Sequence, residues 1–196
     1  MRRLRTNYRR AAGLVKDERG SALLEFAIVL PLLVVFVVGI YDFSGAFNQK
    51  QKMAQAAQEG AILAGAQPTS DIEIGDGSPV SLQPVVAAVF NSLAASGVLP
   101  QANSGSCQAA SNTVTQPAGT LQWNYAISGC PDTLTIVIER GWVPSVPSTT
   151  KSVGTLIEVT YPYRWRFNSV VQLLVPGASY NAITYLVEVA KVHNQM

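Results

Sequence analysis

The feature that most constrains this chain is an apolar segment near its start. No charged residue occurs from Phe26 to Tyr41, and the segment Ser21–Tyr41 spans 21 residues. About 20 helical residues cross the roughly 30 Å of hydrocarbon in a bilayer. The segment exceeds the usual core of a cleaved secretory signal, about 7–15 residues. We therefore expect a retained transmembrane helix over residues 21–41, with a removed signal peptide as the alternative.

The charges on the two sides of this segment predict its orientation. Residues 1–20 contain seven basic and two acidic residues, a net charge of +5, whereas the rest of the chain has a net charge of −3. Basic residues favour the cytoplasmic side of a membrane segment. We expect the N-terminus in the cytoplasm and most of the chain beyond the membrane. Because this topology accounts for the arginines, no nucleic-acid partner is expected.

A single carboxylate, Glu25, lies just inside the apolar segment. A charge there costs about 2.5–3.5 kcal/mol at the centre of a membrane helix and less near its end, so a partner is expected. A cut after Gly20 would give Ser21 a free α-amino group and make Glu25 the fifth residue of the new chain. The alternative is a carboxylate held at the level of the lipid headgroups.

This arrangement resembles the processing site of type IV pilin-like proteins, and in particular the TadE-type minor pilins or pseudopilins of Tad (tight adherence) pili. Further features similar to that family lie in the last fifth of the chain. The residues that carry the resemblance are Gly20, Glu25, Phe26, Pro31, the Ala- and Gln-rich segment Phe43–Ala66, the segment Val159–Arg164 and the apolar segment Ile183–Val192.

The resemblance implies a function in pilus biogenesis and adhesion. A prepilin peptidase would cut between Gly20 and Ser21, and Glu25 would pair with the Ser21 amine of a neighbouring subunit. The other implied partners are pilins or pseudopilins, the inner-membrane assembly platform and the lipid bilayer. The protein would lie in the bacterial inner membrane, with its C-terminal domain in the periplasm or the extracellular pilus.

Three alternatives to this interpretation differ in class. One is an uncleaved single-pass membrane protein whose outer domain binds a surface or a partner. A major pilin is disfavoured because those of Tad pili are typically far smaller. A pseudopilin of general secretion systems usually begins with Phe after the cut, whereas this chain has Ser21.

The chain divides into four predicted segments. They are a leader (1–20), a transmembrane helix (21–41), a helical continuation (42–67) and an α+β domain (68–196). The continuation is rich in good helix formers and carries small residues on one face, at Ala54, Ala57, Ala61 and Ala64, with Phe47 on the same side. This face suits either the protein's own domain or another helix.

The pattern of residues 68–196 predicts a short helix followed by an antiparallel sheet packed on the long helix, an α+β fold of pilin type. Residues 68–81 and 101–119 are predicted to be loops, and Phe167–Leu174 to be a short helix or an apolar crossing. The helix is expected at Pro84–Ser96, and the strands at Gln122–Ile127, Thr133–Val143, Thr155–Tyr163 and Tyr180–His193.

Two cysteines, Cys107 and Cys130, fall in the exported part and suggest one disulfide, with two separate buried thiols as the alternative. We find no catalytic motif, and His193 is the only histidine. We therefore expect no enzyme, no cofactor and no metal site.

The aromatic residues of the predicted strands allow two interpretations. They are usually part of the core, but they could also form an adhesive surface; they are Trp123, Trp142, Tyr161, Tyr163 and Trp165. Arg164 and Arg166 flank Trp165, so this cluster could bind an acidic partner or form cation–π contacts.

Overall fold

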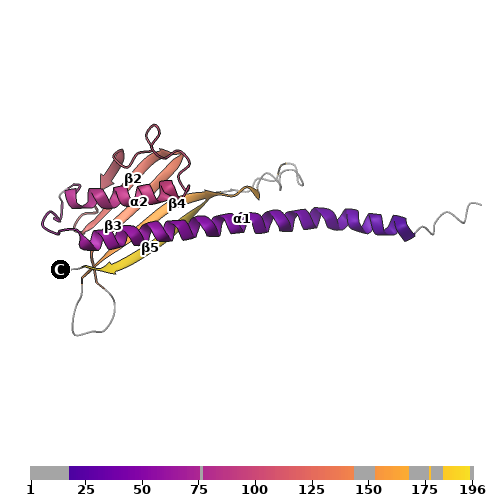
Figure 1. Ribbon diagram of the computed structural model, residues 1–196, viewed down its shortest axis with the longest axis horizontal. Coiled ribbons are helices and arrows are strands. Elements are labelled where there is room, and N and C mark those ends of the chain that lie inside the picture. Colours follow the sequence, from indigo (N-terminus) through magenta and orange to yellow (C-terminus); the bar gives the residue numbers. More distant parts are fainter. Residues whose placement is uncertain (1–17, 76, 144–152, 168–176, 178–182, 195–196) are drawn as a thin grey trace, which may run out of the picture.

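A long helix and a small sheet domain make up the structure (Figure 1), a computed structural model that describes residues 18–75, 77–143, 153–167, 177 and 183–194. Helix α1 (Glu18–Ala66) has 49 residues and projects far beyond the sheet. The C-terminal half of α1 and the shorter helix α2 (Gln83–Ala95) cover one face of the sheet. A single 3₁₀ turn, η1 (Val80–Leu82), precedes α2.

Five antiparallel strands form the sheet, in the order β1-β2-β3-β4-β5. Each strand therefore pairs with its neighbours in the sequence, and β1 and β5 are the edges. The strands are β1 (Asn112–Thr115), β2 (Gln122–Cys130), β3 (Asp132–Trp142), β4 (Gly154–Arg164) and β5 (Ile183–His193). The predicted α+β layout, a long apolar helix with a small antiparallel sheet, is confirmed.

Alternating residues of the central strands form the core. The pairings Tyr125↔Ile136 and Ile138↔Ile157 place these side chains on the helix-covered face, and all four are fully buried. The other face carries polar and half-buried residues, as expected for an antiparallel sheet with one solvated side. The residues of α2 that complete the core are Val85, Val86, Val89, Phe90 and Leu93.

Small residues let α1 approach the sheet and α2 closely. Ala57, Ala61 and Ala64 are buried as predicted, together with Met53, Ala56 and Gly60. A Cβ atom on Gly60 would lie 2.4 Å from Cγ2 of Val89 and 3.1 Å from Cδ1 of Ile157. The C-terminal part of this face therefore packs on the protein's own domain. Its first part does not, because Phe47 is 63% exposed and Ala54 is only partly buried.

The boundaries of several elements differ from the expectation. Strand β1 lies inside the predicted loop 101–119, because β2 supplies the hydrogen-bonding partners that its Asn-Thr-Val-Thr sequence does not indicate by itself. Helix α1 continues through Pro31 without interruption. The element predicted at Phe167–Leu174 lies outside the described residues beyond Phe167, and so does the start of the strand predicted from Tyr180.

The two cysteines form the expected disulfide. Cys107 and Cys130 are fully buried, with their Cα atoms 4.8 Å apart. The bond joins the loop before β1 to the end of β2, and the two cysteines that it links are 23 positions apart in the sequence. On the chain-entropy model such a loop adds about 3 kcal/mol to the free energy of unfolding.

Candidate assembly site on the N-terminal helix

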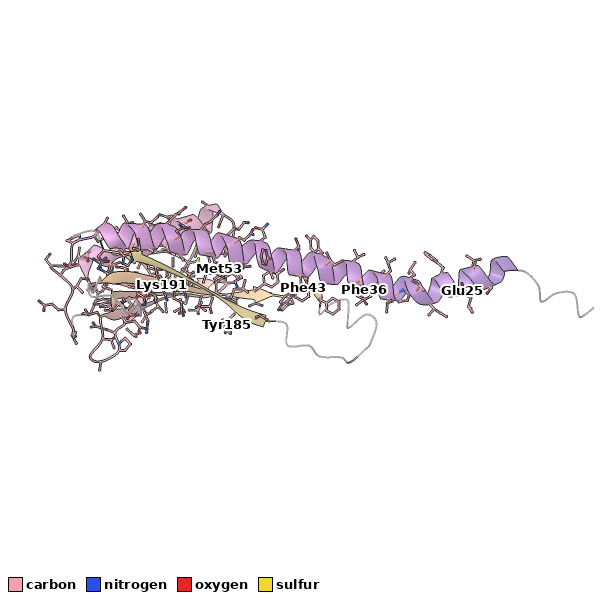
Figure 2. All side chains as sticks on the ribbon, turned by 90° about the horizontal axis from the view of Figure 1, so that it is seen from below. Glu25, Phe36, Phe43, Met53, Tyr185 and Lys191 are labelled. Atoms are coloured by element: carbon pink, nitrogen blue, oxygen red, sulfur yellow. A yellow bond between two sulfur atoms is a disulfide. The ribbon has the colours of Figure 1, made fainter. Side chains whose placement is uncertain are left out.

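The N-terminal half of α1 projects beyond the sheet domain, and most of its side chains are exposed (Figure 2). Its most apolar 18-residue window has a mean hydropathy of 2.8 and is 0% buried. Exposed apolar side chains on this scale are unfavourable in water and suit a lipid environment. The helix is long and apolar enough to cross a membrane, so it fits a single-pass anchor.

The three residues predicted for processing and assembly lie near the start of this exposed half. Ser21 and Glu25 are four residues apart, which places them on one face of the helix. Glu25 is exposed, and among the described residues no ion pair involves it. Figure 2 shows Glu25 far from the sheet, near the end of α1. A Cβ atom on Gly20 would meet no other atom within 4 Å, so packing within the described chain does not require glycine there.

Asp42, a residue that the sequence analysis did not single out, joins α1 to the end of β4. Its Oδ2 accepts a hydrogen bond of 2.5 Å from the backbone N–H of Phe167, and the hydroxyl of Tyr163 donates to its backbone carbonyl at 3.1 Å. Asp42 is only 1% exposed. The one available signal was its position as the first charged residue after the apolar run. We call this contact the Asp42 clamp.

Aromatic residues surround the Asp42 clamp. The ring of Trp165 lies edge-on to both Phe43 and Tyr163, each at a centroid distance of 5.1 Å. Its indole N–H also donates to Oγ1 of Thr184 at 2.8 Å. Burial raises the pKa of the Tyr163 hydroxyl, and the nearby negative charge of Asp42 adds to the effect. Trp165 therefore belongs to a cluster at the junction between helix and sheet.

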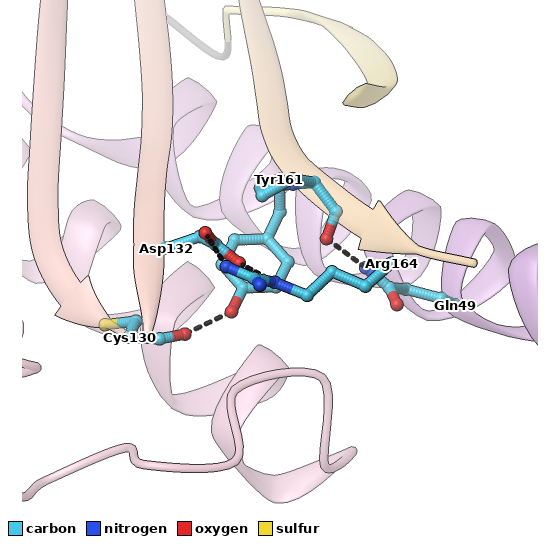
Figure 3. A network of polar contacts seen from close by, with 6 residues as sticks. Gln49, Cys130, Asp132, Tyr161 and Arg164 are labelled. Carbon is cyan, nitrogen blue, oxygen red and sulfur yellow. Dashed lines mark hydrogen bonds and ion pairs between the residues drawn. The ribbon is translucent and has the colours of Figure 1, made fainter. Parts of the chain in front are cut away.

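The two arginines beside Trp165 differ in their contacts. Arg164 forms an ion pair with Asp132 at 2.6 Å (Figure 3), and its hydrogen bonds lower the pKa of that carboxyl. Arg166 is exposed, and no ion pair of it occurs within the described part of the chain. Arg164 is thus already occupied within the sheet, which leaves Arg166 as the available cation of the predicted recognition cluster.

The remaining aromatic residues are divided between core and surface. Trp123 and Tyr161 are buried, and the Tyr161 hydroxyl donates to the Cys130 carbonyl (Figure 3). Trp142 is partly exposed, with Nζ of Lys191 at 4.8 Å from its ring centroid. The core interpretation is therefore correct for Trp123 and Tyr161 and not for Trp142.

A second buried contact fixes the opposite end of the docked half of α1. Arg140 of β3 is only 3% exposed. Its guanidinium donates to the carbonyls of Ala64 and Gln67, at the C-terminal end of α1, and to Oγ1 of Thr155. Burial lowers the pKa of Arg140, although an arginine still stays protonated in a protein. We call this contact the Arg140 cap; no sequence pattern indicated it.

No metal centre accompanies these contacts in the part of the chain that the structure describes, where no group of three or more His, Cys, Asp or Glu side chains is placed to hold an ion. Asp71, in the loop after α1, instead accepts a hydrogen bond of 2.8 Å from the backbone N–H of Ser81. This bond lowers the pKa of the Asp71 carboxyl.

Comparison with known proteins finds a family similar to the N-terminal segment. Residues 20–61 match the family model described as TadE-like protein. The match begins at Gly20 and covers about a fifth of the chain, including the exposed half of α1 and most of the docked half. No curated protein and no solved structure matches the chain.

Proposed function

We propose that this chain is a TadE-like minor pilin or pseudopilin that supports assembly of Tad pili. It acts as a substrate and a structural component, with no catalysis of its own. In this proposal residues 1–20 are a cytoplasmic leader, residues 21–41 span the bacterial inner membrane, and the sheet domain lies in the periplasm or the extracellular fibre. There the domain contributes to adhesion.

The first step is cleavage between Gly20 and Ser21 by a prepilin peptidase. The family match begins at Gly20, and the described chain contains no packing that would require glycine at this position. The bond also lies in the first turn of α1, which begins at Glu18. Helix ends fray, so the peptidase can reach this bond without unwinding the rest of the helix.

The second step uses the charge of Glu25, and this residue carries the proposal. Its carboxylate is exposed on an apolar helix with no cation paired to it in the described chain. Cleavage creates an ammonium group on Ser21, four residues earlier on the same face. In a single subunit that ammonium can neutralise Glu25. In the assembly platform and the fibre, the Ser21 amine of a neighbouring subunit takes its place and sets the register between subunits.

Intact mass and N-terminal sequencing of the membrane-associated protein test the cleavage step. We expect a chain that begins at Ser21 in cells with the prepilin peptidase and an uncut chain in cells without it. A chain that keeps its leader in both strains contradicts the proposal. It would favour the alternative, an uncleaved anchored protein whose outer domain binds a surface or a partner.

Substitution of Glu25 tests the assembly step separately. The variant Glu25→Ala should still be inserted and cleaved, but surface pili should fall more than about tenfold, because loss of one member of a buried charge pair leaves the other uncompensated. Glu59→Ala, which removes an exposed carboxylate from the docked half of α1, is the matched control and should leave pili unchanged. Normal piliation with Glu25→Ala would exclude the charge pairing.

A further inference from the structure

A groove lies where α1 leaves the sheet domain. It has a volume of about 620 Å³ and runs between α1 and the residues that follow β4. Figure 2 labels Phe36 and Phe43 along this stretch of the helix. The residues that line the groove are Val35, Phe36, Gly39, Ile40, Asp42, Phe43, Trp165 and Phe167.

One wall of this groove is negatively charged. Among the described residues that line the groove, Asp42 alone is ionisable, and it is 1% exposed. Its Oδ2 is held by the Phe167 N–H, whereas its Oδ1 is buried and has no hydrogen-bond partner among the described residues. No ion pair neutralises the carboxylate within that part of the chain. A buried carboxylate in this state is costly unless a cation lies beside it.

We propose that the groove binds a phospholipid with a primary ammonium headgroup, and specifically phosphatidylethanolamine. The ammonium lies at Asp42, and an acyl chain follows Val35, Phe36 and Ile40 along the helix. Arg166 does not line the groove, because it lines a separate pocket with Tyr41 and Lys52, so the phosphate is left to water and the ammonium at Asp42 sets the headgroup preference. Phosphatidylserine fits less well, because its extra carboxylate would lie close to Asp42.

The position of the groove along the helix favours a lipid over a protein partner. Val35, Phe36, Gly39 and Ile40 belong to the proposed span, and Asp42 is the first residue beyond it. The apolar wall is therefore continuous with the surface that faces the hydrocarbon, and the carboxylate lies at headgroup level. Trp165 fits this depth as well, since tryptophan concentrates at the membrane–water interface. This inference depends on one part of the proposed function, the insertion of residues 21–41 in a membrane. It does not depend on assembly of the chain into a pilus.

Native mass spectrometry of the full chain, released from lipid nanodiscs into mild detergent, tests the proposal. The nanodiscs contain phosphatidylglycerol with either phosphatidylethanolamine or phosphatidylcholine. We expect one phosphatidylethanolamine retained per chain, and about tenfold less phosphatidylcholine, whose methylated ammonium cannot donate a hydrogen bond to the carboxylate.

Two variants and a control locate the lipid. Asp42→Asn keeps an oxygen that can accept from the Phe167 N–H but removes the charge, so it should abolish the headgroup preference. Gly39→Leu should reduce retention of both lipids, because the position is open and the new side chain would occupy the groove; it leaves the Asp42 clamp intact. Glu158→Gln, which removes a carboxylate from the solvated face of β4, should behave as the unmodified chain.

Several results would overturn the proposal. They are an absence of retained lipid, equal retention of the two headgroups, or unchanged lipid binding in both Asp42→Asn and Gly39→Leu. A chain that is recovered as a dimer, and not displaced by added phosphatidylethanolamine, would instead make the groove a contact between copies. Leader cleavage is read from the intact mass of the same samples, so failure of this inference is distinguishable from failure of the proposed processing.

Discussion

At the scale of single residues, the C-terminal end of α1 shows how a long-range contact can replace a local helix cap. The last carbonyls of a helix lack intrahelical partners, and the last turn of α1 contains no basic residue. Arg140 supplies the donors from β3. Arg140→Met should lower the free energy of unfolding by about 2–4 kcal/mol, because two carbonyls lose a charged donor. Denaturant titration of the full chain in detergent measures this.

The matched control for this prediction is Arg164→Met. Arg164 has a 62% exposed side chain in its ion pair with Asp132, and exposed ion pairs contribute little to the free energy of unfolding. An equal loss of stability in the two variants would show that Arg140 has no special role at the helix end.

The pKa shifts of two carboxyl groups, Asp71 and Asp132, predict how the stability of the fold depends on pH. The Ser81 backbone N–H lowers the pKa of Asp71, and the Arg164 side chain lowers that of Asp132, in each case below the usual value of 3.8. A group with a depressed pKa in the folded state stabilises above its unfolded-state pKa, and this contribution is lost as pH falls through the folded-state value. The melting temperature should therefore fall below about pH 4.

Substitution of each aspartate tests whether these two carboxyl groups cause the pH dependence of the melting temperature. Asp71→Asn and Asp132→Asn should each flatten the decline in melting temperature between about pH 4 and pH 2, while Glu158→Gln should leave it as it is. The effect is small because both carboxyls are partly exposed. A decline that is equally steep in all three variants would place the titrating groups elsewhere.

At the scale of elements, the contact between α1 and its two neighbours depends on Gly60. Alanine is the better helix former by about 1 kcal/mol, yet its methyl group would clash with Val89 and Ile157. Overpacking typically costs about 1–3 kcal/mol, so Gly60→Ala should lower the free energy of unfolding despite the gain in helix propensity. Gly39→Ala, at a helical position with open space, is the control and should be neutral or stabilising. A more stable Gly60→Ala protein would contradict the close packing.

The same elements show what could be predicted from sequence. The periodicity and the residue types of the sequence were sufficient to predict α1, α2 and the strands β2 to β5, since each carries a long apolar or β-branched pattern. Strand β1 escaped prediction because Asn112–Thr115 is short and polar and becomes a strand only through pairing with β2. The Asp42 clamp and the Arg140 cap escaped for a related reason: their partners are 125 and 76 residues away, and no local pattern reports such a contact.

At the scale of the whole molecule, the structure predicts that the sheet domain folds without its anchor. The exposed half of α1 contributes nothing to the core, so a chain of residues 42–196 should be soluble and melt within about 3 °C of the full protein. A chain of residues 48–196 lacks the Asp42 clamp and should melt about 4–8 °C lower. Circular dichroism of both fragments checks this, and an unfolded 42–196 fragment would show that the anchor is part of the folding unit.

The Asp42 clamp and the Arg140 cap lie at opposite ends of the docked half of α1, and this spacing governs how the protein responds to mechanical force. A pull on the anchor along the helix axis loads both contacts and all the packing between them at once, in shear. A sideways pull would open them one after another, by peeling. In the fibre of the proposed function, tension would run along the helices, so the domain would meet force in the direction in which its attachment is strongest.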